Sequence, residues 1–147
     1  MTVFFASDHA GFALKEVLKA HVASLGHDVV DVGAITYEEG DDYPSFIHTA
    51  AEHVATTDDT RGIILGGSGQ GEAMVANRHS GIRAAVYMGD HSDGLDPVAL
   101  AREHNDANVL SIGARFVNEE EAKAAVERFL NTPFSTDERH VRRLTQF

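Results

Sequence analysis

Apolar runs typical of buried strands alternate along this chain with segments of helical periodicity. The expected strands cover residues 2–7, 29–32, 62–65, 82–87 and 109–112. The expected helices cover residues 11–25, 44–55, 98–103, 119–131 and 136–144, with a further short helix that ends at residue 78. Such alternation requires parallel strands joined by right-handed crossovers, with helices on both faces. The sequence therefore predicts an α/β fold, a single-domain Rossmann-like three-layer α/β/α sandwich with a five-stranded parallel sheet and a C-terminal helix.

Length and residue usage limit the classes of protein that fit. A chain of 147 residues is long enough for one domain and too short for two ordinary ones, so we expect one domain over residues 1–147. It contains no cysteine, which excludes disulfides and thiolate metal sites. The first residues lack the pattern of a signal peptide, and no apolar run approaches the roughly 18 residues of a membrane span. We therefore expect a cytoplasmic protein without membrane contacts.

The overall charge of the chain argues against polyanionic partners. The net charge of −11 argues against nucleic acid and anionic membranes as partners. The positive charge includes a local concentration, because Arg139, Arg142 and Arg143 all fall within the last nine residues. This patch is either the solvated end of a basic helix or a local anion site. On charge alone we favour the solvated helix end.

The glycine-rich stretch 66–72, with the sequence GGSGQGE, lies between an expected strand and a helix start. Its glycines permit positive φ and let a ligand approach the backbone, and N–H groups at a helix start favour an anion. Glu72 does not suit a static phosphate cradle, because its carboxylate would repel a bound phosphate. A carboxylate that takes a proton from a substrate, beside amides that hold the resulting oxyanion, suits this position.

Other interpretations of the same stretch are weaker. A P-loop needs a lysine after its last glycine, and this chain has Glu72 there. A dinucleotide fingerprint belongs after the first strand, whereas these glycines follow the third, although Asp90 lies at a suitable distance for a ribose contact. We keep a non-catalytic nucleotide-binding module as the alternative from another functional class. Residues 90–93 (DHSD) could suggest a metal site, but their turn-rich surroundings favour a solvated loop.

Parallel sheets of this kind bind ligands beyond the carboxyl ends of their strands. Asp8 and His9 follow the first strand, residues 66–72 follow the third, and Arg115 follows the fifth. We therefore expect these residues to meet at one edge of the sheet. His104 lies just before the fifth strand, and histidine is a natural proton shuttle near neutral pH.

These motifs resemble those of the type B ribose-5-phosphate isomerases, a family that includes the galactose-6-phosphate isomerase subunits. The matching motifs lie in order along the chain at residues 7–15, 42–44, 66–72, 76–77, 81–84, 101–110, 113–115 and 139–143. Members interconvert an aldose phosphate and a ketose phosphate through a cis-enediolate, without a metal or cofactor. The resemblance implies a metal-independent aldose–ketose isomerase of carbohydrate metabolism that acts on ribose 5-phosphate and ribulose 5-phosphate.

The resemblance also implies roles for single residues. One branch of the family has a cysteine base at the position of Gly66, whereas this chain resembles the branch with a glutamate base at the position of Glu72. Glu72 would move a proton between carbons 1 and 2, and His104 would help to open the furanose ring. The remaining implied roles are Ser68 and the amides of Gly67, Gly69 and Gly71 on the enediolate oxygens, Asp8 and Asn105 on sugar hydroxyls, Tyr43 near the ring, and His9, Arg115, Arg139 and Arg143 on the phosphate.

Two further expectations concern assembly and substrate. The family builds its active sites at a dimer interface, which implies a homodimer that could assemble further into a tetramer. Residues 88–97 form a segment that looks several residues longer than in the family, and we favour an inert surface loop over one that reshapes the pocket. The alternative substrates are therefore another four- to six-carbon sugar phosphate or a free sugar.

Overall fold

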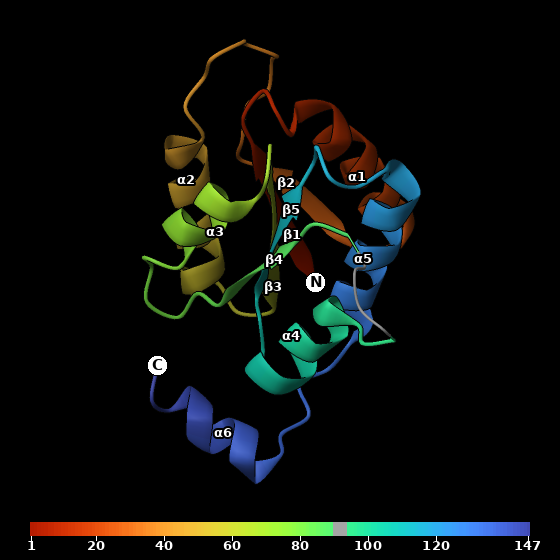
Figure 1. Cartoon of the computed structure of the whole chain (residues 1–147). Coiled ribbons are helices and arrows are strands. Elements are labelled where there is room, and N and C mark those ends of the chain that lie inside the picture. Colours follow the sequence, from red (N-terminus) through yellow and green to blue (C-terminus); the bar gives the residue numbers. More distant parts are fainter. Residues whose placement is uncertain (90–93) are drawn as a thin grey trace.

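The computed structural model describes residues 1–89 and 94–147 (Figure 1). In this part of the chain, five parallel strands form one sheet in the order β2-β1-β3-β5-β4. The strands are β1 (Thr2–Ser7), β2 (Asp28–Asp31), β3 (Thr60–Gly66), β4 (Ala84–Tyr87) and β5 (Val109–Gly113). The predicted fold class is confirmed.

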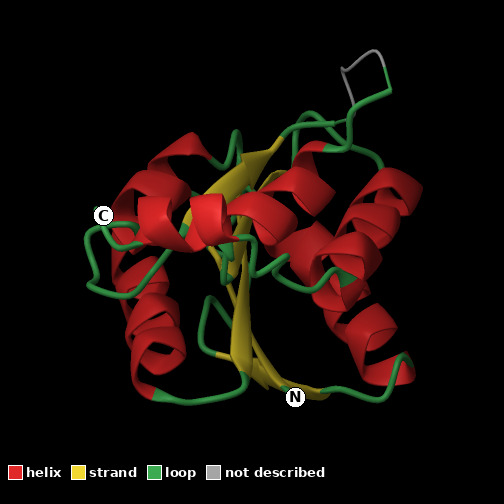
Figure 2. Ribbon diagram, turned by 90° about the horizontal axis from the view of Figure 1, so that it is seen from below, coloured by secondary structure: helices red, strands yellow, loops and turns green. Residues whose placement is uncertain are grey.

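Helices cover both faces of this sheet (Figures 1 and 2). They are α1 (Phe12–Ser24), α2 (Tyr43–Thr56), α3 (Gln70–Ala76), α4 (Pro97–Asn105), α5 (Glu119–Asn131) and α6 (Glu138–Leu144). Helices α2 and α3 pack together on one face, and α1 and α5 pack together on the other. Helix α6 lies apart from both pairs and contacts α4 at the lower end of Figure 1. No helix in the described ranges combines the length and the apolar character needed to cross a membrane.

Neighbouring residues of a strand contribute to different cores, because successive side chains point to opposite faces. Phe5 and Ile63 are buried in the cluster beneath α1 and α5, whereas Phe4 and Ile64 are buried in the cluster beneath α2. Both faces of the sheet are therefore apolar. This double burial explains why the strands appear in the sequence as continuous apolar runs.

Some element boundaries differ from the sequence-based prediction for local reasons. Strand β4 begins at Ala84 rather than at residue 82, and the N–H of Arg83 donates to the Asn108 side chain at 2.8 Å instead of to a strand. Helix α6 begins at Glu138 rather than at residue 136, because Thr136 has φ 57°, which is incompatible with a right-handed helix. Neither shift moves a residue of the predicted site to another element.

Candidate active site

A cleft of about 540 Å³ opens at the carboxyl edge of the sheet. It is lined by Asp8, His9, Ala10, Tyr43, Gly67, Ser68, Gly71, Glu72, Arg115 and Phe116. The loops after β1, β3 and β5 and the first residue of α2 therefore converge here, as predicted for a parallel sheet. Eight of the residues predicted for the site share this cleft, and Ala10 and Phe116 are additions that the sequence did not single out.

Hydrogen bonds hold the glycine-rich turn against the neighbouring strand β5 and the residues that follow it. Gly69 has φ 75°, a left-handed conformation that glycine adopts without steric cost, and it caps the start of α3. The Ser111 hydroxyl donates to the carbonyl of Gly69 at 2.6 Å. The two residues after β5 donate their N–H groups to the carbonyls of Gly66 and Gly67. The turn is thus held in a fixed conformation beside Ser68.

Glu72 is a buried carboxylate in the first turn of α3, with 4% of its surface exposed. Burial raises the pKa of Glu72, and the negative charge of Asp8 raises it further, while a backbone hydrogen bond acts in the opposite direction. A raised pKa makes a carboxylate a stronger base, which favours its taking a proton from a substrate before returning it. Its position and environment suit a general base that also acts as the acid.

His9 is paired with a residue that the sequence analysis did not select. Oδ1 of Asp41 lies 2.7 Å from the imidazole Nδ1 of His9 and accepts the backbone N–H of the same residue at 2.8 Å. The hydrogen bond to Asp41 raises the pKa of His9, and the charge of Asp8 adds to the rise, against the effects of burial and of Arg115. The available sequence signal was the position of Asp41 directly before the motif at residues 42–44.

Within residues 1–89 and 94–147, Asp8, His9 and Asp41 are the group whose potential ligand atoms all lie within 4.8 Å of one another. In this structure one oxygen of Asp41 accepts two hydrogen bonds from His9. We therefore interpret the group as a hydrogen-bonded pair beside Asp8. The solvated loop predicted at residues 90–93 lies outside the described residues, as does Asp90 of the dinucleotide alternative.

Four predicted site residues lie at the opposite end of the sheet. His104 and Asn105 end α4 and precede β5, so they lie near the amino edge, whereas Glu72 lies beyond the carboxyl edge. The five residues of β5 separate the two edges by about 16 Å at roughly 3.3 Å per residue. Arg139 and Arg143 belong to α6, which packs on α4 and lies far from α3 in Figure 1. One chain therefore does not bring these four residues to Glu72.

The four residues belong to a second cluster around α4 and α6. The rings of His104 and His140 lie 4.3 Å apart between centroids, and Nδ1 of His140 lies 2.8 Å from the Ser135 hydroxyl. Burial lowers the pKa of His140, and His104 lowers it further. Arg139 and Arg143 lie one helical turn apart and are exposed, as expected for side chains that could meet one anion.

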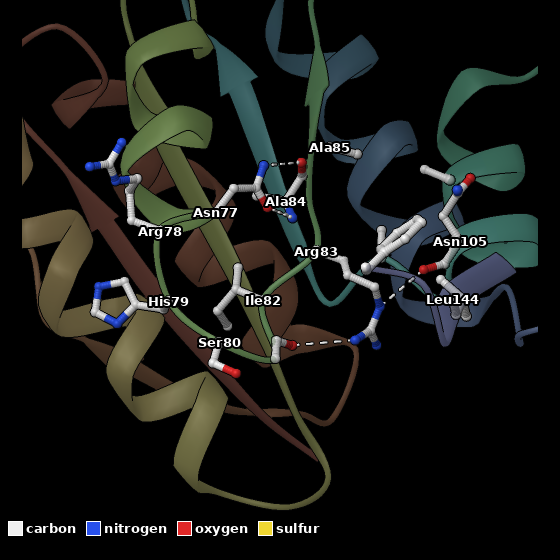
Figure 3. Close-up of a pocket in the computed structure, with 14 residues that line it drawn as sticks. Asn77, Arg78, His79, Ser80, Ile82, Arg83, Ala84, Ala85, Asn105 and Leu144 are labelled. Atoms are coloured by element: carbon white, nitrogen blue, oxygen red, sulfur yellow. Dashed lines mark hydrogen bonds between the residues drawn. The ribbon is translucent and has the colours of Figure 1, made fainter.

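A hollow of about 810 Å³ adjoins this second cluster and includes Asn105 and Leu144 in its lining (Figure 3). Arg83 spans it, donating to the carbonyl of Asn105 at 3.0 Å and to the carbonyl of Gly81 at 3.3 Å. The hollow shares no lining residue with the cleft around Glu72. Within residues 1–89 and 94–147, this hollow and the cleft around Glu72 are therefore separate, and each contains part of the predicted site.

Comparisons with known proteins agree with both the motifs and the fold. Residues 3–147 match the family described as Ribose/Galactose Isomerase. The chain is 43% identical over 144 residues to ribose-5-phosphate isomerase B of Mycolicibacterium paratuberculosis, covering 98% of this chain and 87% of the relative. Ribose-5-phosphate isomerase B of Mycobacterium tuberculosis is 41% identical over 144 residues, with 98% and 86% covered. The solved structure of ribose-5-phosphate isomerase B from Mycoplasma genitalium with bound ribulose-5-phosphate is similar with a TM-score of 0.89, at 36% identity over 99% of this chain and 92% of that one.

Proposed function

The chain belongs to the Ribose/Galactose Isomerase family, and on that premise we propose that it interconverts ribose 5-phosphate and ribulose 5-phosphate. The observation that carries the proposal is the buried carboxylate of Glu72 beside the fixed glycine-rich turn, in a cleft that also contains His9 and Arg115. A proton acceptor, oxyanion donors and cationic side chains are the three components that isomerisation of a phosphorylated sugar requires.

The chemistry follows from these groups. Glu72 removes the proton from carbon 2 of the open-chain aldose, which gives a cis-enediolate, and returns the proton to carbon 1. A proton moves from the oxygen on carbon 2 to the oxygen on carbon 1 during the same conversion. Ser68 and the backbone N–H groups of the turn stabilise the enediolate oxygens, because donors already in place require no reorganisation. The hydrogen bonds that hold the turn against β5 support this role.

The remaining components require a second copy of the chain. We propose a homodimer in which the α4–α6 cluster of one chain covers the cleft of the other. His104 of the partner would then assist ring opening, and the arginines of α6 would join His9 at the phosphate. The separation of the two clusters within one chain supports this arrangement. Exposed apolar side chains on both parts supply surface to bury, with Met74 of α3 68% exposed and Phe147 beyond α6 79% exposed.

Mixing inactive variants tests this assembly. Glu72→Gln chains mixed with His104→Asn chains under exchange conditions should recover about a quarter of wild-type activity, because half the random dimers contain one intact site of two. The control is a mixture of Glu72→Gln with Ser68→Ala, whose defects fall in the same cleft. That mixture should gain nothing over the average of its parents. Equal behaviour of the two mixtures would show that each site is built from one chain.

The substrate is tested with a panel of aldose phosphates of four to six carbons, together with free ribose. The proposal expects the highest kcat/KM for ribose 5-phosphate. A higher value for another sugar phosphate or for free ribose would select one of the alternative substrates. Nucleotide binding without any isomerase activity would select the non-catalytic module instead.

We further propose that one domain over residues 1–147 carries this activity in the cytoplasm.

A further inference from the structure

The loop before α2 brings a carboxylate to His9 from 32 residues away in the chain. Asp41 makes its contacts to both the backbone and the side chain of His9 through one oxygen, and 12% of the Asp41 side chain is exposed. An ionised carboxylate only accepts hydrogen bonds, so Nδ1 of His9 carries the hydrogen in this pair. The second ring nitrogen, Nε2, is therefore left to meet a ligand in the cleft that His9 lines.

The loop that carries Asp41 is anchored at its beginning by a buried lysine. The ammonium group of Lys15 is fully buried and donates to Oδ2 of Asp31 and to the carbonyl of Ala34. The other oxygen of Asp31 accepts the N–H of Gly33 at 3.0 Å. At its far end the loop enters α2, whose first residue Tyr43 lines the cleft. Both ends of the loop are thus fixed, which limits the positions that Asp41 can take.

We propose that Asp41 is a positioning residue: its carboxylate lies against Nδ1 of His9, orients the imidazole, favours its cationic form, and so determines how strongly the cleft binds the substrate phosphate. The inference rests on the proposed function, in which His9 contacts that phosphate. The charged groups that face His9 are Asp41, Asp8 and Arg115, and the Tyr37 ring meets it edge-on at 6.3 Å. Among these, the hydrogen bond that His9 donates to Asp41 has the largest effect on the pKa of His9, which it raises.

Asp41 could instead act only as a negative charge near the phosphate, and the two roles predict effects of opposite sign. A bare like-charge neighbour would repel the phosphate, so its neutralisation would strengthen binding. A positioning partner favours the cationic form of His9, so its neutralisation would weaken binding. The sign of the change in phosphate affinity therefore separates the two roles directly.

The test compares Asp41→Asn with Asp42→Asn in the full-length protein. The amide introduced by Asp41→Asn keeps an oxygen that can accept from His9 but removes the charge, whereas Asp42 is exposed and makes no side-chain hydrogen bond at the helix start. For Asp41→Asn we expect the KM for ribose 5-phosphate and the inhibition constant for inorganic phosphate to rise about tenfold at slightly alkaline pH, with kcat little changed. Both increases should shrink as the pH falls, because acid protonates His9 without help. Asp42→Asn should behave as wild type.

A measurement on the free protein keeps the inference independent of activity. NMR titration should show His9 losing its proton at lower pH in Asp41→Asn than in wild type, with no change in Asp42→Asn. An unchanged His9 titration, or tighter phosphate binding in Asp41→Asn, would overturn the inference. If Asp41→Asn does not fold, the NMR spectrum of the His9 imidazole in the wild-type protein provides the test. The pairing requires a hydrogen-bonded Nδ1–H on His9, and its absence would overturn the inference. An absence of isomerase activity in wild type would overturn the proposed function, while the titration would still test the pairing.

Discussion

Gly66 and the carboxylate of Glu72 lie so close together that any side chain at position 66 would overlap Oε1 of Glu72. Because Gly66 at the end of β3 has no side chain, the carboxylate of Glu72 can occupy the space beside it. The branch of the family that this chain does not resemble has a cysteine base at this position, and Glu72 would obstruct such a side chain. The two bases exclude each other in this geometry, which supports our proposal that the chain uses the glutamate.

Replacing Glu72 with glutamine keeps its shape and removes the proton acceptor. We expect kcat for ribose 5-phosphate to fall by roughly 10²–10⁴-fold, the usual size of a general-base effect, with little change in substrate binding. Gln70→Ala, in the same helix but exposed, is the matched control and should retain activity. Steady-state kinetics would contradict the assignment if the Glu72→Gln enzyme turned over at a near-wild-type rate, and Ser68 would then be the next candidate.

Gly66→Ala tests the space that the carboxylate needs. The added methyl group would displace the Glu72 carboxylate, and we expect a loss of roughly 10²-fold in kcat from this misplacement. A double-mutant cycle supplies the control, because Gly66→Ala should cost almost nothing more in the Glu72→Gln background. Fully additive losses in kcat would mean that residue 66 acts through some other group.

The acid limb of the pH profile should report the environment of Glu72. The base must be deprotonated to act, and burial and Asp8 raise its pKa, so kcat/KM should fall with decreasing pH at values above those of an ordinary glutamate. Asp8→Asn should move this limb to lower pH, because it removes the negative charge that raises the pKa of Glu72. The limb should stay above the range of an ordinary glutamate, because Glu72 remains buried. Asp42→Asn should leave it in place. A wild-type limb at or below the ordinary glutamate range would contradict this account.

Arg139 and Arg143 should act on phosphorylated substrates only. We expect Arg139→Ala and Arg143→Ala each to raise the KM for ribose 5-phosphate about tenfold or more, because each loses a charged donor to the phosphate. Arg142 is exposed on the same helix and provides the control, since Arg142→Ala should change KM little. Small and equal effects on ribose 5-phosphate and unphosphorylated ribose would identify the arginines as a solvated helix end.

Removal of divalent ions should leave the reaction intact. In our proposal Ser68 and backbone N–H groups meet the charge of the enediolate, so we expect full activity after dialysis against a strong chelator. Addition of Mg²⁺ or Zn²⁺ should then give no stimulation. Loss of activity on dialysis and its return with a divalent ion would require a metal-dependent mechanism, and Asp8, His9 and Asp41 would be the first residues to substitute.

Local patterns in the sequence predicted the elements well. Apolar runs and helical periodicity identified all five strands, and the order of these elements led to the parallel sheet. The carboxyl-edge rule also placed Asp8, His9, Ser68 and Glu72 together correctly, because the ends of parallel strands must meet at one edge. Boundaries such as the start of α6 were missed, since they depend on the conformation of a single residue, Thr136.

The sequence by itself determined the sheet, its parallel direction and the glycine-rich turn, because short-range periodicity and glycine chemistry specify these features. Only the tertiary structure showed that Asp41 reaches His9, that Gly66 makes room for Glu72, and that α6 packs on α4 far from Glu72. Each of these findings concerns how close two parts of the chain come to each other once the chain has folded. Such distances depend on how the helices pack against the sheet, which no local pattern of residues encodes.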